Sequence, residues 1–243
     1  MTQNIDKVRQ PAPEPEDLPR QRTAPPRPAT PFWRRPWMIP LWIVTAAFLY
    51  LQVNPFVGTP EAEAPIPPHD GFPAYYPLLI THIIAGTITM LAVCLQVWPK
   101  LRRRNPALHR WSGRIYVVAC VIAAVIGLIL VPFAPVPGQV GVTMATVLWL
   151  VFSIAGWVSA RRNRWAKHRR YMLYSFALVM NNVWGLFIVR TAFEMGYTGD
   201  ITYLLETARW FGWVINLMLV QWWLNRTTRR PVERPADRHF VTN

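Results

Sequence analysis

The pattern of apolar and polar positions divides the chain into six long apolar stretches separated by short polar ones. Each stretch spans roughly 18–24 residues, which is long enough for a helix to cross a hydrocarbon core of about 30 Å. The apolar runs are continuous rather than alternating, and this favours helices over a β-barrel. The six segments are 37–56, 76–98, 113–133, 139–160, 171–193 and 207–224. The sequence therefore predicts an all-α fold, a polytopic membrane helix bundle with six transmembrane helices.

The charges between these segments alternate in sign along the chain. Arginine-rich stretches precede the first segment and follow the second, fourth and sixth, whereas the loops after the first and fifth segments are acidic. The loop after the third segment is rich in proline and uncharged. Because basic loops stay on the cytoplasmic side, this pattern predicts that the N-terminus and C-terminus are both cytoplasmic. It also predicts a multi-pass protein of the bacterial cytoplasmic (inner) membrane.

Composition refines the class of partner and the two ends of the chain. The formal net charge is +14, with 26 Lys and Arg against 12 Asp and Glu. A nucleic-acid-binding protein would gather such charge on one face, but here it lies in short clusters between apolar segments, so the predicted partner is the lipid bilayer and not nucleic acid. Residues 1–36, rich in Pro and Arg, are predicted to be a disordered cytoplasmic tail, and 225–243 a basic cytoplasmic tail. The chemistry is therefore expected in the transmembrane domain, 37–224.

Small residues in the third apolar segment predict how the helices pack. Ala119, Ala123 and Gly127 recur every four residues, and such a stripe lets helix backbones approach closely in lipid. The second and third segments are joined by a short loop, as are the fourth and fifth. We expect each of these two pairs to form an antiparallel hairpin.

His82 is the main polar group predicted to lie within the membrane. It falls about six residues into the second segment, or roughly 9 Å from its outer end, and Gly86 follows it on the same helix face. Intramembrane polar residues are costly and mark functional sites. A histidine above a glycine leaves room for a flat ligand, but a histidine bonded to Thr81 or to a neighbouring helix would need no ligand.

Two further histidines occupy matching places in the chain. ALHRWSGRIY carries His109 and AKHRRYMLYS carries His168, each in a His-Arg pair just before a helix on the cytoplasmic side. These two histidines can therefore share one site, while His82 belongs to another. Two histidines without Cys or acidic neighbours make a poor zinc site. Polar residues at the boundary between water and lipid are the simpler interpretation of both.

The other intramembrane polar residues suggest packing rather than catalysis. Asn181 and Asn182 lie in the middle of the fifth segment, where asparagines commonly bond across helices. Arg190 and Glu194 are spaced as a helical ion pair. No Asp or Glu lies in the middle of a predicted helix, and the sequence has no HExxH, GxSxG or P-loop motif. These features favour a protein that is not an enzyme.

The stretch HIIAGTITMLAVCLQVWPKLRRRNPALHRWSGRIYVV resembles an uncharacterised family of bacterial multi-pass membrane proteins, known as a domain of unknown function. The features that carry the resemblance are His82 with Gly86, the Arg-rich loop, and the motifs that begin at His109 and at His168. They cover about residues 74–174. The resemblance implies a membrane domain with recurring histidines and supplies no activity.

A looser resemblance is to the b-type four-helix membrane cytochromes, which hold haem between histidines on neighbouring helices. It implies haem b as a cofactor, with His109 and His168 as ligands and with Arg110 and Arg169 beside the propionates. In this interpretation His82 is a third cofactor-binding residue, and His69 in the outer loop is its one candidate partner.

Three hypotheses of function therefore stay open. The chain is a non-enzymatic integral membrane protein, with a membrane-protein partner or a second copy of itself; or a haem-binding, redox-active membrane protein; or a small transporter. A transporter should show broken helices and a polar site near the middle of the membrane, and Asn181 and Asn182 are the residues that favour it.

Overall fold

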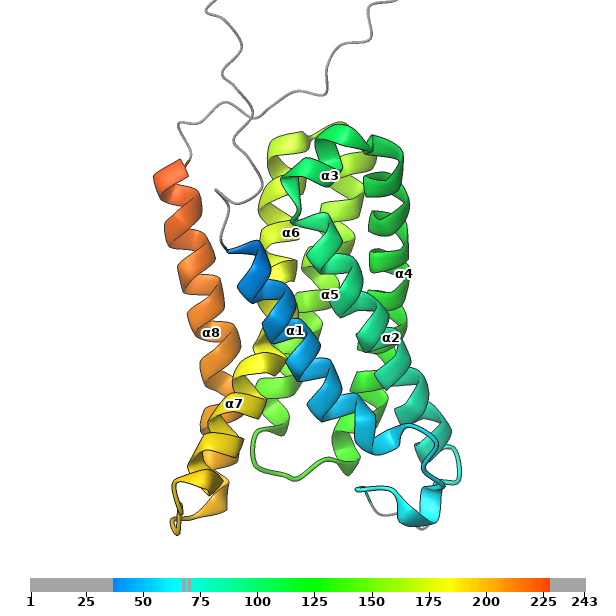
Figure 1. Ribbon diagram of the computed structural model, residues 1–243, viewed down its shortest axis with the longest axis vertical. Coiled ribbons are helices and arrows are strands. Elements are labelled where there is room, and N and C mark those ends of the chain that lie inside the picture. Colours follow the sequence, from blue (N-terminus) through cyan, green and yellow to red (C-terminus); the bar gives the residue numbers. More distant parts are fainter. Residues whose placement is uncertain (1–36, 67–68, 70, 228–243) are drawn as a thin grey trace, which may run out of the picture. The chain divides into compact units, whose positions relative to one another are not determined.

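Every regular element in the described part of the chain, residues 37–66, 69 and 71–227 of this computed structural model, is a helix (Figure 1). The predicted tail 1–36 lies outside the described residues, as does the tail 225–243 from residue 228 onward. Residues 225–227 form the last turn of the final helix. The α-helices are α1 (Met38–Val53), α2 (Tyr75–Gln96), α3 (Pro99–Arg104), α4 (Pro106–Leu130), α5 (Gln139–Arg161), α6 (Trp165–Val179), α7 (Asn181–Glu194) and α8 (Ile201–Thr227), with single 3-10 turns at Asn54–Phe56, Glu61–Glu63 and Val131–Phe133.

Five helical stretches in the described residues are long and apolar enough to cross a membrane: Met38–Phe56, Tyr75–Gln96, Pro106–Phe133, Gln139–Arg161 and Trp165–Glu194. They correspond to the first five predicted segments, so the all-helical, multi-pass fold is confirmed. The sixth predicted segment, 207–224, lies inside α8. That helix is long, but Arg209, Asn216 and Gln221 lower its mean hydropathy, and it is not among the five.

The start of α4 shows how local sequence sets a helix boundary. The side chain of Asn105 accepts a hydrogen bond from the Leu108 N–H at 3.0 Å, and Pro106 occupies the first helical position. An Asn cap followed by Pro at this position is a favoured helix start. The helix therefore begins at Pro106, earlier than the predicted 113, and His109 lies in its first turn. His168 lies in the first turn of α6 in the same way.

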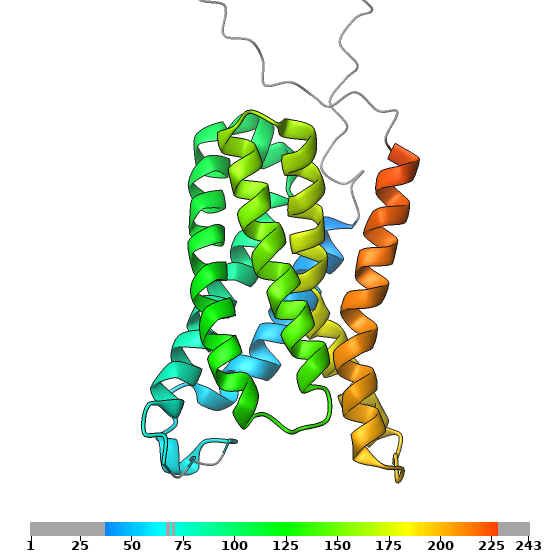
Figure 2. The ribbon, with the colours of Figure 1, turned by 180° about the vertical axis from the view of Figure 1, so that it is seen from behind.

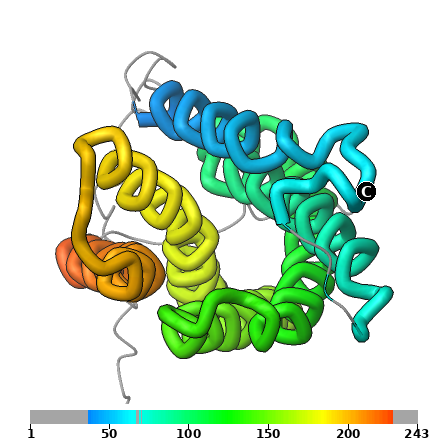
Figure 3. The backbone as a smooth tube through the Cα atoms, turned by 90° about the horizontal axis from the view of Figure 1, so that it is seen from below, coloured from blue at the N-terminus to red at the C-terminus, as the bar shows by residue number. Residues whose placement is uncertain are grey.

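Two antiparallel hairpins form the centre of the fold, as the sequence predicts. α2 packs along α4 and α5 along α6, and further contacts of α4 with α5 and of α2 with α6 close a ring of four helices (Figures 2 and 3). Ala119 and Ala123 of the predicted small-residue stripe are buried on α4. Their short side chains let the helices approach closely, and dispersion between packed surfaces then holds the bundle together in lipid.

A buried polar cluster ties three of these helices together. Ser153 of α5 bonds Ser175 of α6 at 2.7 Å and accepts from the Cys120 thiol of α4 at 3.1 Å. The Tyr116 hydroxyl of α4 bonds Ser175 and accepts from the Trp149 indole of α5 at 3.2 Å. Because a polar group in hydrocarbon is costly without a partner, these bonds fix the mutual depth of α4, α5 and α6.

The fifth predicted segment, 171–193, is interrupted in the structure. α6 ends at Val179, and α7 begins at Asn181 and runs in a different direction toward α1 and α8 (Figure 3). The carbonyl oxygen of Ala177 accepts a hydrogen bond from the Asn216 carboxamide of α8 at 2.9 Å. A side chain that inserts into the helical hydrogen-bond ladder is a recognised cause of a kink, and here it satisfies the carbonyl that the break leaves free.

Candidate functional site

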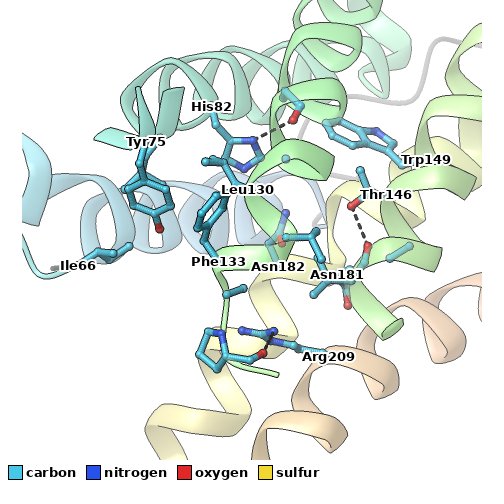
Figure 4. A pocket seen from close by; sticks show the side chains of 18 of the residues that line it. Ile66, Tyr75, His82, Leu130, Phe133, Thr146, Trp149, Asn181, Asn182 and Arg209 are labelled. Atoms are coloured by element: carbon cyan, nitrogen blue, oxygen red, sulfur yellow. Dashed lines mark hydrogen bonds between the residues drawn. The ribbon is translucent and has the colours of Figure 1, made fainter. Parts of the chain in front are cut away.

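A cavity of about 800 Å³ opens beside this helix break, at the end of the bundle away from the arginine-rich loops (Figure 4). Its walls come from α2, α4, α5, the α6–α7 junction and the start of α8, and from the loops that precede α2 and α5. Most of the lining is apolar or aromatic, and a few polar side chains interrupt it. The lining residues used below are His69, His82, Trp149, Asn181, Asn182 and Arg209.

His82 extends from α2 to the wall of this cavity (Figure 4). Its Nδ1 lies 2.8 Å from the carbonyl oxygen of Ala123 on α4. A carbonyl oxygen can only accept a hydrogen bond, so Nδ1 donates. In the neutral imidazole Nε2 is then an acceptor, and no hydrogen bond to Nε2 is found among the described residues. The bond across to α4 is the arrangement expected for a histidine held by a neighbouring helix.

The glycine that makes room for the His82 ring is Gly127 of α4, a residue that the sequence did not link to His82. A Cβ added at Gly127 would lie 3.0 Å from His82 Cε1, whereas a Cβ at Gly86 would have nothing within 4 Å. The small residues that let α4 approach α2 therefore also leave space for the imidazole ring of His82. Thr81, the alternative partner considered for His82, bonds the carbonyl of Pro77 within its own helix.

Asn181 and Asn182, the first two residues of α7 after the helix break, line the cavity. The carboxamide of Asn182 extends toward the cavity on the side facing His82 (Figure 4). The Oδ1 of Asn181 is buried and has no hydrogen-bond partner among residues 37–66, 69 and 71–227. A Cβ added at Gly212 would lie 2.6 Å from it. The asparagine that does bond across helices is Asn216, through Ala177 and through the Trp184 indole at 3.0 Å.

Side chains of α8 hold the loop before α5, which forms part of the cavity wall. The guanidinium of Arg209 donates to the carbonyl oxygens of Pro135 and Pro137 at 3.3 and 3.2 Å. Glu206 accepts the backbone N–H of Gly138 at 2.6 Å. Gly138 has φ +81°, a conformation that glycine adopts without strain. Three polar contacts thus hold the loop before α5 against the first turns of α8.

The cavity also brings together two histidines that are far apart in the sequence. His69, the proposed partner of His82, lines the same cavity and packs edge-on against Tyr75 with ring centroids 4.1 Å apart. The sequence identified His82, Asn181 and Asn182 as polar groups at depth, but not Arg209 or Trp149. Arg209 could have been recognised as a cation inside the apolar segment 207–224, while nothing in the sequence distinguishes Trp149 from the other tryptophans.

His109 and His168 lie at the opposite end of the bundle, within electrostatic range of each other. His168 donates from Nδ1 to the carbonyl oxygen of Gly156 at 2.8 Å. The Nδ1 of His109 is buried and has no hydrogen-bond partner in the part of the chain that the structure describes. Gln96 of α2 donates to the His109 backbone carbonyl oxygen at 2.8 Å. The two predicted partners thus share one end, separate from His82.

The arginines next to these histidines have different surroundings. Arg110 is exposed, whereas the guanidinium of Arg169 lies over the ring of Trp223 on α8, with Cζ 5.0 Å from the ring centroid. The predicted ion pair of Arg190 with Glu194 is confirmed, with 2.8 Å between Nε and Oε1. In residues 37–66, 69 and 71–227, no group of three or more His, Cys, Asp or Glu side chains could hold a metal ion.

The sequence of this part of the chain resembles a known group of membrane proteins. Residues 79–224, from α2 to near the end of α8, match a family described as "Predicted membrane protein (DUF2306)". The match covers more than half of the chain and includes both histidine sites except for His69. No curated protein and no solved structure shows a significant match to the chain.

Proposed function

The chain belongs to the DUF2306 family of predicted membrane proteins, and from that premise we propose that it binds a small, largely apolar ligand in the cavity beside His82. In this proposal it is a non-enzymatic, multi-pass protein of the bacterial cytoplasmic membrane. Apolar cavities with a few convergent polar groups are the usual form of small-molecule sites.

We infer six crossings, with both termini cytoplasmic, and with the cavity opening to the outer side. α8 has 27 residues, so it is about 40 Å long and can serve as the sixth span. Its outer end carries Asp200, which accepts the backbone N–H of Thr202 at 2.7 Å. That bond lowers the pKa of the Asp200 carboxyl. The sign difference between the two ends supports this orientation.

The observation that carries the proposal is the fixed orientation of His82. Because its Nδ1 donates to Ala123, its Nε2 can accept a hydrogen bond from a ligand on the cavity side. A ligand with an O–H or N–H group on an apolar body fits this wall, and Asn182 offers a second polar contact. The break between α6 and α7 beside this site also favours the transporter hypothesis over a purely structural role, since broken helices commonly build transport sites.

Binding of tetramethylhydroquinone, compared with its dimethyl ether, tests the proposal in the full-length protein in lipid nanodiscs. The hydroquinone should bind about 5- to 100-fold more tightly, because the ether leaves Nε2 without a partner, at about 1–3 kcal/mol. His82→Phe keeps a ring of similar size and should abolish the difference. His109→Phe, at the other end, is the matched control and should preserve it. Equal binding of the two probes to the wild type would contradict the proposal.

A second candidate function, haem binding at the other end, is supported by His109 and His168. The hydrogen bond from His168 Nδ1 to Gly156 leaves Nε2 available, and metal-ligating histidines are usually held by such a bond. We expect a visible Soret band in protein purified from haem-supplied cells, lost in both His109→Ala and His168→Ala. A colourless, folded preparation would rule this candidate out.

A further inference from the structure

Arg209 is the one Lys, Arg, Asp or Glu among the described residues that line the cavity beside His82. Glu206, one turn earlier on α8, lies within electrostatic range of its guanidinium. The two carboxylate oxygens of Glu206 accept hydrogen bonds from the Gly138 N–H and the Trp210 indole, at 2.6 and 3.1 Å. Glu206 therefore offsets part of the positive charge but does not occupy the hydrogen-bond donors of Arg209.

The guanidinium of Arg209 is held in one orientation by the loop before α5. Its Nη1 donates to the carbonyl oxygens of Pro135 and Pro137 at 3.3 and 3.2 Å. Its aliphatic stem packs closely on Gly138, where an added Cβ would lie 3.1 Å from both Cβ and Cγ of Arg209. No hydrogen bond to Nε or Nη2 is found in the part of the chain that the structure describes. The edge that stays available is the one on which the Nε–H and one Nη2–H point in parallel.

This edge of Arg209 is suited to a carboxylate. Two parallel N–H donors match the two oxygens of one carboxylate, and such charge-assisted, bidentate pairs are among the strongest hydrogen bonds in proteins. A single cation that Glu206 partly offsets balances one negative charge better than two, so a monoanion is favoured over a phosphate dianion. Arg209 and His82 lie at opposite ends of the view in Figure 4, with Phe133 and Asn182 between them. The two polar ends of the site therefore suit different groups of one ligand.

We propose that the ligand of this cavity is an apolar monocarboxylic acid, with its carboxylate on the Nε–Nη2 edge of Arg209 and its body along the apolar walls. This inference rests on the proposed function and names the class of ligand for the same site. The O–H or N–H group that His82 Nε2 accepts lies on the body of the acid, away from the carboxylate. Arg209 thus has two roles, because it holds the loop before α5 through Nη1 and binds the ligand through its other edge.

Ligand-observed NMR titration of p-hydroxyphenylpropionate, compared with its carboxamide, tests the inference in the full-length protein in phosphatidylcholine nanodiscs. The two probes have the same phenol and nearly the same size, but only the acid is charged at neutral pH. The acid should bind about 10-fold more tightly, because it alone forms a charge-assisted pair with Arg209. Arg209→Gln should bring this affinity ratio close to one. Arg190→Gln removes a cation that does not line the cavity and should keep the ratio.

The affinity ratio separates recognition of the ligand from support of the loop. If Arg209 only held the loop, Arg209→Gln would weaken both probes equally and leave the ratio unchanged. Where circular dichroism shows that Arg209→Gln does not fold, Arg209→Lys takes its place. The lysine keeps the charge without the planar fork and should give an intermediate ratio.

Three outcomes would overturn the inference: equal affinity of the acid and the amide for the wild type, an unchanged ratio in the folded Arg209 variant, or an equal loss of the ratio in Arg190→Gln. Tetramethylhydroquinone and its dimethyl ether show whether the proposed function fails as well. A preference for the hydroquinone without a preference for the acid would remove the carboxylate and leave the proposed function standing.

Discussion

Replacing Gly212 by alanine should destabilise the folded protein by about 1–3 kcal/mol, because the added methyl has no space between α7 and α8. A Cβ at this position would lie 2.6 Å from Asn181 Oδ1, 2.8 Å from Trp184 Cβ and 3.1 Å from the Asn181 carbonyl oxygen. Two of these three atoms belong to the backbone or lie next to it, so they cannot move aside without shifting α7.

Gly86→Ala is the matched control, since a Cβ at Gly86 would meet nothing within 4 Å. That variant should be neutral or up to about 1 kcal/mol more stable, because alanine is a better helix former than glycine. Denaturation in mixed micelles, followed by helical circular dichroism, measures both variants. Equal stabilities for the two would mean that α7 and α8 do not approach as closely as the structure shows.

The effect of Gly212→Ala should extend to the cavity as well. Asn181 lines the cavity and also contacts Gly212, so a methyl at position 212 pushes against one cavity wall. Gly212→Ala should therefore weaken binding of the hydroquinone probe, whereas Gly86→Ala should leave it unchanged. This difference connects the packing of α8 with the proposed ligand site.

Five of the six predicted segments and the two hairpins could be predicted from the sequence because they depend on properties of short, continuous segments. An apolar run of sufficient length forms a helix in lipid, where every backbone group needs a partner. A short loop between two such helices then forces the second to run antiparallel to the first. The small residues Ala119 and Ala123 also indicated close packing, and both are buried on α4.

The break in the fifth segment could not be predicted, because its cause lies on another helix. Neither proline nor glycine occurs between Phe176 and Asn182, so local signals favour a continuous helix. The residue that bonds the carbonyl of Ala177 is Asn216, 39 positions further along the chain. A single sequence does not show which of its asparagines faces which backbone carbonyl.

Only part of the candidate site could be predicted, because here too some partners lie on other helices. The place of His82 inside the second helix followed from its apolar run, and the shared end of His109 and His168 followed from the alternation of charges. The neighbour of His82 did not follow, because Gly127 and Ala123 belong to α4 and the rotation of α4 is set by packing. The serines of the buried cluster, Ser153 and Ser175, were likewise inconspicuous within apolar runs.

Asn216→Leu should be the substitution that most alters the shape of the α6–α7 segment. It removes the donor to the Ala177 carbonyl and the acceptor for the Trp184 indole, at 2.9 and 3.0 Å. The Ala177 carbonyl and the Trp184 indole each lose their bond to Asn216, and we expect a loss of about 1–3 kcal/mol in total, since the net contribution of such a bond in a membrane is modest. Asn182→Leu, which removes no hydrogen bond found in the structure, is the control and should change stability little.

The same variant tests why the helix breaks. With Asn216 gone, the Ala177 carbonyl can accept the Asn181 N–H, which would restore the ladder and straighten α6 into α7. Spin labels at Arg164→Cys and Met195→Cys report the end-to-end distance, and the native Cys94 and Cys120 are buried, so they should label slowly. We expect the labelled ends to move apart in Asn216→Leu and to keep their distance in Asn182→Leu. If the distance is unchanged in both, the break is intrinsic to the α6–α7 sequence, and the cavity wall then does not depend on α8 for its shape.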